Sequence, residues 1–232
     1  AVFGCGTLAA FGVFGVLVSL LGLFFNATST GVVPETGSPG SNPVEQIGEP
    51  QATIDPGDLD LCSRNLASSS KLSMMRIGDQ DNYTDTINSG ERRISDQCEW
   101  ELIPDYNSAL NWRLDYSYSA VISSPDASRI DVASKDFDER SREIEAEFSE
   151  IESKGEGDLA DRSYFVYGEL SQGITGYVLL AQTRSAVYEI SLEARGNSAM
   201  NETVPENAMQ HEASKLVSVS EVEFKLWIPG SD

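Results

Sequence analysis

The sequence has few of the side chains on which most catalytic and metal sites depend. It contains one histidine, His211, and three cysteines, whereas a zinc site needs several Cys or His ligands. No serine stands in a Gly-x-Ser-x-Gly sequence, and no glycine-rich phosphate loop or dinucleotide-binding fingerprint is present. His211 falls within the pattern of the last predicted helix, where a surface position is expected. The sequence therefore predicts a protein that is not an enzyme and that has no cofactor and no metal site.

One stretch, Asp79–Asp85, is rich in the oxygen ligands that calcium prefers. It departs from an EF-hand loop, because Thr84 stands where glycine is needed and Gly90 where the bidentate glutamate belongs. A loop tip is therefore the preferred interpretation, and a calcium site is the alternative.

Basic residues are also scarce. The chain has 16 Lys and Arg against 37 Asp and Glu, which gives a formal net charge of −21 at pH 7. Nucleic-acid binding needs basic side chains that neutralise phosphates, so no nucleic acid is expected as a partner. An anionic lipid surface is disfavoured for the same reason. The acidic residues are spread along the chain, which indicates solubility or salt tolerance, and an acidic surface that steers a basic partner is the alternative.

Charge is absent altogether from the first 25 residues. Ala1–Phe25 has only Thr7 and Ser19 as polar side chains, and its length matches the roughly 20 apolar residues that cross a hydrocarbon core. A secretory signal peptide has an apolar region of only about 7–15 residues and a small-residue cleavage site, which is not found here. We therefore predict a retained, single-pass transmembrane helix over residues 1–25 that anchors the chain in the cell membrane.

Small residues gather on one side of this predicted helix. At 100° per residue, one sector holds Gly4, Cys5, Ala9, Gly12, Gly15, Ser19 and Gly22. Small residues let another helix approach closely, so this side is predicted to pack against integral membrane protein subunits. The alternative is that glycine and alanine are simply frequent in membrane helices.

A segment rich in Pro, Gly and Ser follows, over residues 26–56. It shows no apolar periodicity, which is typical of a linker. Its prolines are Pro34, Pro39, Pro43, Pro50 and Pro56. Residues 57–232, which we call the head, are enough for one domain with its own core.

The periodicity of the head predicts an α+β domain. Helical spacing predicts three helices, over residues 58–75, 134–154 and 203–219. The second is expected to begin at the N-cap Ser134 and the third at a capping box, Thr203–Glu206. Alternation predicts five strands, the last two joined as a hairpin, around residues 98–102, 112–119, 164–170, 176–183 and 186–194. Residues 76–91 are predicted as a polar loop, and residues 222–228 fit either a continued helix or an edge strand.

Two of the three cysteines, Cys62 and Cys98, lie in the head. If the first helix packs on the sheet, Cys62 reaches Cys98 at the start of the first strand, and we predict a disulfide between them. Such a bond suits an oxidising compartment. The prediction therefore places the head on the extracytoplasmic side, periplasmic or extracellular, and the N-terminus inside. The alternative is a pair of reduced core cysteines.

The order of these elements resembles a family, the extracytoplasmic lipoprotein-like domains of actinobacteria grouped as DUF3558. The matching residues are Asp60-Leu-Cys62 on the first helix and Cys98-Glu-Trp100 on the first strand, and the resemblance covers about residues 55–226. It implies a fold like that of the PsbP and Mog1 proteins, an antiparallel β-sheet with helices packed against it. It implies no particular activity. Members of the family are usually lipid-anchored, whereas this chain has a predicted spanning helix.

These features predict a non-catalytic, membrane-anchored accessory subunit that braces the outer face of a larger membrane protein complex. Actinobacterial respiratory cytochrome supercomplexes carry single-span subunits with outward-facing heads, so by analogy such a supercomplex is a candidate assembly. The alternative is a tethered module that binds a small ligand or lipid between the sheet and its helices. Four tyrosines are candidates to line that pocket: Tyr116, Tyr118, Tyr164 and Tyr177.

Overall fold

The computed structural model describes residues 54–78, 82–105, 111–195 and 203–230. The predicted spanning helix at 1–25 lies outside these residues, and so do its small-residue side (Gly4, Ala9, Gly12, Gly15, Ser19 and Gly22) and the predicted linker before Ile54. Within the described ranges, no helix combines the length and the apolar character needed to cross a membrane.

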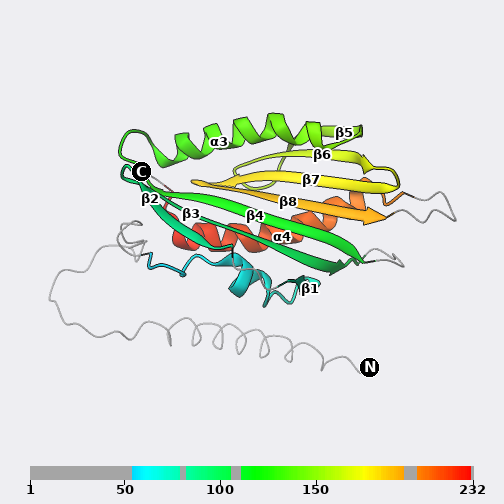
Figure 1. Ribbon diagram of the computed structural model, residues 1–232, viewed down its shortest axis with the longest axis horizontal. Helices are drawn as coiled ribbons and strands as arrows, with labels where there is room; N and C mark the ends of the chain where they lie inside the picture. Colours follow the sequence, from blue (N-terminus) through cyan, green and yellow to red (C-terminus); the bar gives the residue numbers. More distant parts are fainter. Residues whose placement is uncertain (1–53, 79–81, 106–110, 196–202, 231–232) are drawn as a thin grey trace, which may run out of the picture. The chain divides into compact units, whose positions relative to one another are not determined.

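The head is an antiparallel sheet with helices on both of its faces, which agrees with the predicted α+β class (Figure 1). The strands are β1 (Ser73–Ile77), β2 (Thr84–Asn88), β3 (Glu91–Ile103), β4 (Trp112–Ser123), β5 (Glu150–Gly157), β6 (Arg162–Ser171), β7 (Ile174–Thr183) and β8 (Ala186–Arg195). The helices are the π-helical turn η1 (Leu61–Leu66), α3 (Arg129–Glu143), the 3₁₀ turn η2 (Ile144–Glu147) and α4 (Glu206–Trp227). Each of the five predicted strands lies within an observed one, and β7 and β8 form the predicted hairpin.

The strands follow the order β1-β3-β4-β8-β7-β6-β5. β5 to β8 form a meander of antiparallel neighbours, and β8 then pairs with β4 in the middle of the sheet. The long strand β3 has two partners on its outer side: β2 pairs with residues 91–95 and β1 with residues 99–103. One edge of the sheet is therefore shared by two short strands, and β5 forms the other edge.

α4 covers one face of the sheet, where most of the apolar core lies. Its buried residues recur at helical spacing and are Met209, Glu212, Ala213, Leu216, Val217, Ser220 and Phe224. Phe224 contacts the rings of Tyr118 and Tyr188 at centroid distances of 5.6 and 5.2 Å. Together with η1, this stripe packs on the inward side chains of β3, β4, β7 and β8.

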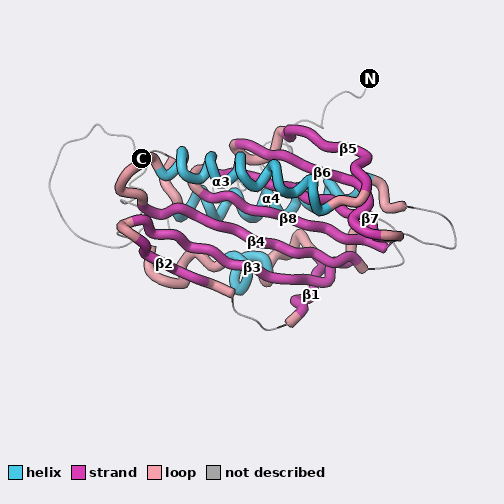
Figure 2. The backbone as a smooth tube through the Cα atoms, turned by 45° about the horizontal axis from the view of Figure 1, so that its top comes forward, coloured by secondary structure: helices cyan, strands magenta, loops and turns pink. Residues whose placement is uncertain are grey.

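α3 covers part of the opposite face. Its N-terminus is capped by Ser128, whose hydroxyl accepts a hydrogen bond from the N–H of Asp131. A second, smaller core lies beneath it and consists of Ala133, Phe137, Ile144, Val166, Val178, Leu180 and Val187. Figure 2 shows α3 running over the β6–β8 side of the sheet, whereas β1 and most of β3 carry no helix on that face.

A disulfide joins Cys62 on η1 to Cys98 on β3, as predicted, with the two Cα atoms 5.9 Å apart. Both cysteines are buried. Beside them, the carbonyl of Leu59 accepts a hydrogen bond of 2.6 Å from the Tyr118 hydroxyl. Ile54, which lies within the predicted linker, is 3% exposed and packs in the same core. The segment that leads into the sheet is therefore fixed by both covalent and apolar contacts.

The predicted helix over 58–75 is wrong beyond its first part. Helical structure ends at Leu66, and Ser73–Ile77 forms β1 instead. The serines at 68–70 favour turns over helix, and pairing with residues 99–103 supplies the main-chain partners of β1. The predicted polar loop at 76–91 is also wrong in part, because it contains β2. Both errors concern edge strands. β1 depends on a partner far along the chain, whereas β2 is the first strand of a hairpin that turns at Ser89 and Gly90, a turn that the sequence prediction missed.

The predicted helix over 134–154 is misplaced. α3 begins at Arg129 with Ser128 as its cap, not Ser134, and helical structure ends by Glu147. Residues 150–157 form β5, which pairs with β6. The spacing of Phe148 and Ile151 fits a helix, but the partner strand overrides that local preference.

The last helix differs from its prediction at both ends. Its N-cap is Pro205, which makes no side-chain hydrogen bond, so the predicted capping box at 203–206 does not form. At the other end, α4 continues to Trp227, and residues 222–227 extend the helix rather than forming a strand. Phe224 accounts for the continuation, because only the helix brings its ring into the core.

Gly168 on β6 allows the main chain of β5 to approach closely. A Cβ at this position would contact the carbonyl oxygen of Glu150 and lie 3.0 Å from the Cα of Ile151. Since these are main-chain atoms, the strand has to move, and Gly168→Ala is expected to lower the free energy of unfolding by about 1–3 kcal/mol in a urea titration. Gly155→Ala is the matched control, because its Cβ meets only the Phe165 ring at 3.8 Å. An equal loss in both variants would contradict this explanation.

Candidate functional site

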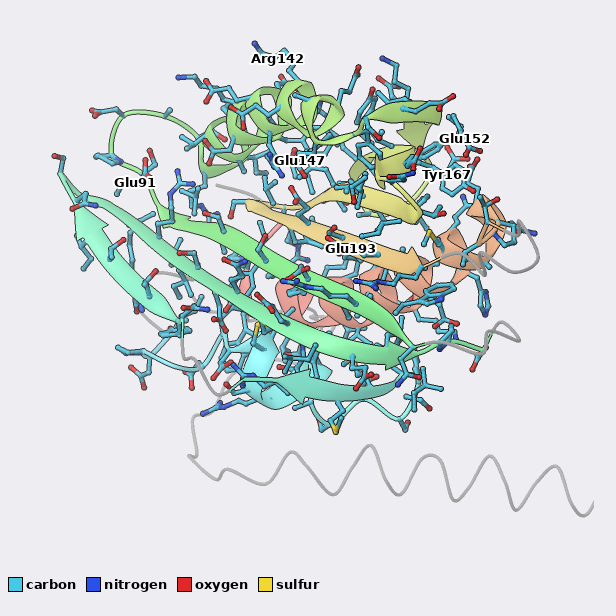
Figure 3. All side chains as sticks on the ribbon, turned by 45° about the vertical axis from the view of Figure 1, so that its right-hand side comes forward. Glu91, Arg142, Glu147, Glu152, Tyr167 and Glu193 are labelled. Atoms are coloured by element: carbon cyan, nitrogen blue, oxygen red, sulfur yellow. A yellow bond between two sulfur atoms is a disulfide. The ribbon has the colours of Figure 1, made fainter. Side chains whose placement is uncertain are left out.

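The part of the sheet that α3 leaves uncovered is polar and faces solvent, and we call it the open sheet face. Its side chains come from the second half of β3, the first half of β4 and the second half of β8. They are Gln97, Glu99 and Glu101 on β3, Arg113, Asp115 and Ser117 on β4, and Glu189, Ser191 and Glu193 on β8. Glu193 can be followed in Figure 3, on the side of β8 that faces away from α4.

Alternation along the strands creates this face. On β3, Cys98 and Trp100 point into the core beneath α4, so Glu99 and its alternate neighbours point the other way. The same argument holds on β4, where Leu114 and Tyr116 are buried. Every second residue of three adjacent strands is therefore brought onto one surface.

Carboxylates on the open sheet face lie directly opposite one another. Glu99 is the cross-strand neighbour of Asp115, and Arg113 stands between Glu101 and Glu193 in the next row. Like charges at directly opposed positions destabilise a sheet. The opposition of Glu99 and Asp115 therefore works against the stability of the head, to the extent that the charge of Arg113 does not compensate it.

Arg113 is the cation at the centre of this face. Its guanidinium lies 3.0 Å from the carboxylate of Asp115 and 3.1 Å from that of Glu99, and the charge of Asp115 raises the pKa of Arg113 above its usual value. Glu101 instead accepts a hydrogen bond of 2.8 Å from the amide of Asn111. Among the residues that the structure describes, no ion pair is formed by Glu193. The guanidinium of Arg113 thus forms ion pairs with two of the four neighbouring carboxylates.

The carboxyl group of Asp115 responds to this crowding. Burial raises its pKa, Arg113 lowers it, and Glu99 and Glu189 raise it further, so that the net pKa lies above the ordinary value. The ionised carboxylate is therefore less favourable in the folded chain than in the unfolded one.

Asp115→Asn is accordingly expected to raise the free energy of unfolding at pH 7, by less than about 1 kcal/mol. An acid whose folded pKa is raised loses stability as the pH rises from its unfolded pKa of 3.8 through the folded value, so no gain is expected at pH 3. Urea titrations at pH 3, 5 and 7 measure the effect. Asp138→Asn is the control, because this α3 carboxylate is 56% exposed and pairs with Arg162. A loss of stability in Asp115→Asn at pH 7 would contradict the argument.

A hollow of about 530 Å³ lies at one end of the open sheet face. It is lined by Glu101, Asn111, Arg113, Ile174, Glu193, Ala194 and Arg195. Ile174 and Ala194 contribute apolar surface, and the remaining side chains are polar or charged. The hollow has the size and the chemistry to take up one long polar side chain or a small polar ligand.

An apolar row borders the open sheet face at the edge of the sheet. It consists of Met75 and Ile77 on β1 and Ile103 on β3, which are 65%, 46% and 58% exposed. Met75 is the neighbour of Glu101 and Ile77 that of Glu99. Large apolar side chains that are exposed side by side, with a polar surface next to them, are typical of an interaction site.

Ion pairs to α3 form the opposite border. Arg140 lies 2.6 Å from Glu189, and Arg93 lies 2.5 Å from Asp136. Glu189 is thereby neutralised by its own chain. Of the described carboxylates on the open sheet face, the two without an ion pair are Glu101 on β3, next to the apolar row, and Glu193 on β8, three strands away from β1.

A separate polar cluster connects the end of β3 to α4. The ligand atoms of Asp105, His211 and Glu212 lie within 4.8 Å of one another. The ammonium of Lys215, however, lies 2.5 Å from Asp105 and 3.0 Å from Glu212. His211 is exposed, at the surface position predicted for it. Because the lysine already supplies the positive charge, we assign this cluster a structural role.

The four tyrosines proposed as pocket residues do not lie together. Tyr116, Tyr118 and Tyr177 are at most 3% exposed and pack in the core beneath α4. Tyr164 lies on the opposite face, in the α3 core, where its hydroxyl donates a hydrogen bond of 2.7 Å to Glu145. Their role in the described head is packing.

From the sequence, the residues of the open sheet face can be recognised only as the polar positions of three strands in which polar and apolar residues alternate. No pattern in the sequence indicates that this half of the sheet has no helix over it. No family model matches the chain, and no curated protein or solved structure is significantly similar to it.

Proposed function

We propose that this chain is a non-catalytic, membrane-anchored accessory subunit of a larger membrane protein complex, and that its head binds the outer face of that complex. The observation that carries the proposal is the open sheet face together with the apolar row at its border, where Met75, Ile77 and Ile103 are exposed beside a polar surface. Water contact is unfavourable for such side chains, and a partner that covers them gains the free energy of their burial.

The disulfide supports an extracytoplasmic position of the head. Cys62 and Cys98 are joined within the core, and structural disulfides persist in oxidising compartments rather than in the cytosol. The position agrees with a single-pass anchor over residues 1–25 that keeps the head on the periplasmic or extracellular side of the cell membrane. An actinobacterial respiratory cytochrome supercomplex is a candidate assembly by analogy, because such supercomplexes carry single-span subunits with outward-facing heads.

Purification of the full chain in a mild detergent tests the proposal. We expect integral membrane proteins to co-purify with it in fixed proportion. Gly12→Leu/Gly15→Leu adds bulk to the small-residue side of the predicted anchor, and we expect this variant to lose most of the co-purifying protein. Val13→Phe/Leu17→Phe adds bulk on the opposite side and is the matched control. A wild-type chain that purifies alone would refute the proposal.

The hollow supports a second candidate, a tethered module that binds a small ligand. Its lining combines the apolar side chain of Ile174 with the charged groups of Glu101, Glu193 and Arg195. Since the guanidinium groups of Arg113 and Arg195 balance the two carboxylates, that combination fits a small polar molecule that carries charges of both signs. Native mass spectrometry of the chain purified from its own membrane distinguishes the two candidates, because a bound molecule adds a defined mass.

A further inference from the structure

We propose that the partner segment covering the open sheet face is a basic polypeptide in which Lys or Arg side chains stand next to apolar ones. This inference rests on the proposed function, since it names the chemistry of the partner that the head binds.

The charge of the face is the first argument. Glu99, Glu101, Asp115 and Glu193 surround the guanidinium of Arg113. Arg195, two residues after Glu193 on β8, is the other cation that lines the hollow, so four carboxylates stand against two guanidinium groups. Adjacent strands are about 4.8 Å apart, so the carboxylates lie well within the Debye length of about 8 Å at physiological ionic strength. Their mutual repulsion is therefore felt in solution, and a positive charge brought by a partner relieves it.

The hollow gives that positive charge a place. Glu101 and Glu193 stand on either side of Arg113, which turns toward Asp115 and Glu99. An incoming lysine or arginine that enters the hollow meets two carboxylates that form no ion pair with Arg113, and it has to lie clear of the guanidinium of Arg195 in the same lining. Its aliphatic stem can lie against Ile174, which lines the same hollow.

The apolar row indicates that the partner segment carries apolar side chains as well as positive charge. Met75 and Ile77 lie one strand away from Glu101 and Glu99 on the same face. From β1 to β8 the surface spans three strand spacings, about 14 Å. A helix with its side chains is about 10–12 Å wide, so one amphipathic segment is broad enough to touch both the apolar row and the carboxylates.

Other occupants fit the face less well. The segment over residues 26–56 contains Glu35, Glu45 and Glu49 and no Lys or Arg. A second copy of the chain brings the same acidic surface and a net charge of −21. Both would add negative charge to a surface that already has an excess of it.

The open sheet face and the apolar row lower the stability of the free head, which also favours a bound partner. Opposed carboxylates and exposed apolar side chains both disfavour the free head. Burial, together with the charges of Glu99 and Glu189, raises the pKa of Asp115, so ionisation of this carboxyl group adds to that cost. Features that oppose stability are expected at functional sites, where binding a partner offsets them.

Peptide binding to the full chain, reconstituted in nanodiscs of neutral lipid, tests the inference. Three fluorescent peptides of equal length serve as probes: one of Arg and Leu, one of Arg and Ser, and one of Glu and Leu, with empty nanodiscs as the blank. We expect the Arg and Leu peptide to bind most tightly. Glu99→Gln/Glu101→Gln/Glu193→Gln is expected to weaken its binding about tenfold, because three favourable charge pairs are lost. Met75→Ser/Ile103→Ser is expected to weaken binding of this peptide more than binding of the Arg and Ser peptide.

The matched control is Glu139→Gln/Glu143→Gln/Glu150→Gln, which changes the net charge equally at exposed positions outside the open sheet face. It should alter the affinity less than about twofold. An equal loss of peptide affinity in the two triple variants, or no loss in either, would overturn the inference. Self-association of the chain that Ile103→Ser abolishes would overturn it as well.

The result also separates this inference from the proposed function. If membrane proteins co-purify but the two triple variants lose peptide affinity equally, this inference alone is refuted. The absence of co-purifying proteins would refute the proposed function, and the peptide result would still decide this inference.

Discussion

Cys62→Ala/Cys98→Ala is expected to lower the free energy of unfolding of the head by about 3–4 kcal/mol. The bond closes a loop between residues 36 positions apart, and in the chain-entropy model a crosslink of that span restricts the unfolded chain by roughly this amount. Both cysteines are buried, so the two alanines also lose some packing. Urea titration of the detergent-solubilised chain, followed by tryptophan fluorescence, measures the difference.

Cys5→Ala is the matched control, because Cys5 lies outside the described head and is not part of the bond. It should leave the urea midpoint of the head unchanged. Unfolding in the presence of a reductant should bring the wild-type chain close to the double variant. A wild-type midpoint that does not respond to reductant would contradict the assigned role of the bond.

Lys215→Met is expected to lower the free energy of unfolding by about 3 kcal/mol, as is typical when one partner of a buried ion pair is removed. The side chain of Glu212 is only 2% exposed, and that of Lys215 is 16% exposed. Without the ammonium, the Glu212 carboxylate keeps a hydrogen bond from the main-chain N–H of Asp105 but has no cation beside it. A buried charge without a counter-charge is far more costly than a buried neutral group.

Two further variants make this prediction specific. Glu212→Gln/Lys215→Met should recover much of the loss, because the uncompensated charge is gone. Lys225→Met removes the exposed i,i+4 partner of Glu221 on the same helix and should cost less than about 0.5 kcal/mol. Similar losses for Lys215→Met and Lys225→Met would show that burial of the pair has little effect.

Alkaline pH provides an independent check on Lys215. Burial lowers its pKa, but hydrogen bonds to Asp105 and Glu212 outweigh that effect and the net pKa is raised. A base with a raised folded pKa contributes stability that is complete below its unfolded pKa, here 10.5, and is lost as the pH rises through the folded value. The gap in stability between the wild type and Lys215→Met should therefore narrow above about pH 10.5.

The strands that sequence reasoning identified are those with a paired strand on each side. Residues 112–119 and 186–194 alternate clearly, because one side of each strand must face the core and the other faces solvent or α3. β1 and β2 were missed because they are short edge strands, and the residues that stabilise them lie on β3. Residues 222–228 fitted two periods, and only the tertiary contacts of Phe224 with Tyr118 and Tyr188 distinguish them.

The sequence predicts which residues of the open sheet face point outward, but not that they form one uncovered surface. Alternation alone assigns Glu99, Asp115 and Glu193 to outward positions. Their neighbourhood depends on strand order, which brings β8 back to β4 after a meander through three other strands. The uncovered state of the face depends on the placement of α3 over the β6–β8 side (Figure 2). Neither the strand order nor the helix placement follows from local periodicity.

The sulfur bridge also determines where mechanical load enters the head. Only residues 55–61 separate Ile54, the first described residue, from Cys62, and fully stretched they extend by about 25 Å. Any further pull passes across the bridge to Cys98 on β3, a strand flanked on both sides within the eight-stranded sheet. Force therefore does not act first on β1, the short strand that would peel away most easily. It is resisted by β3, whose release requires the rupture of its pairing with β1, β2 and β4.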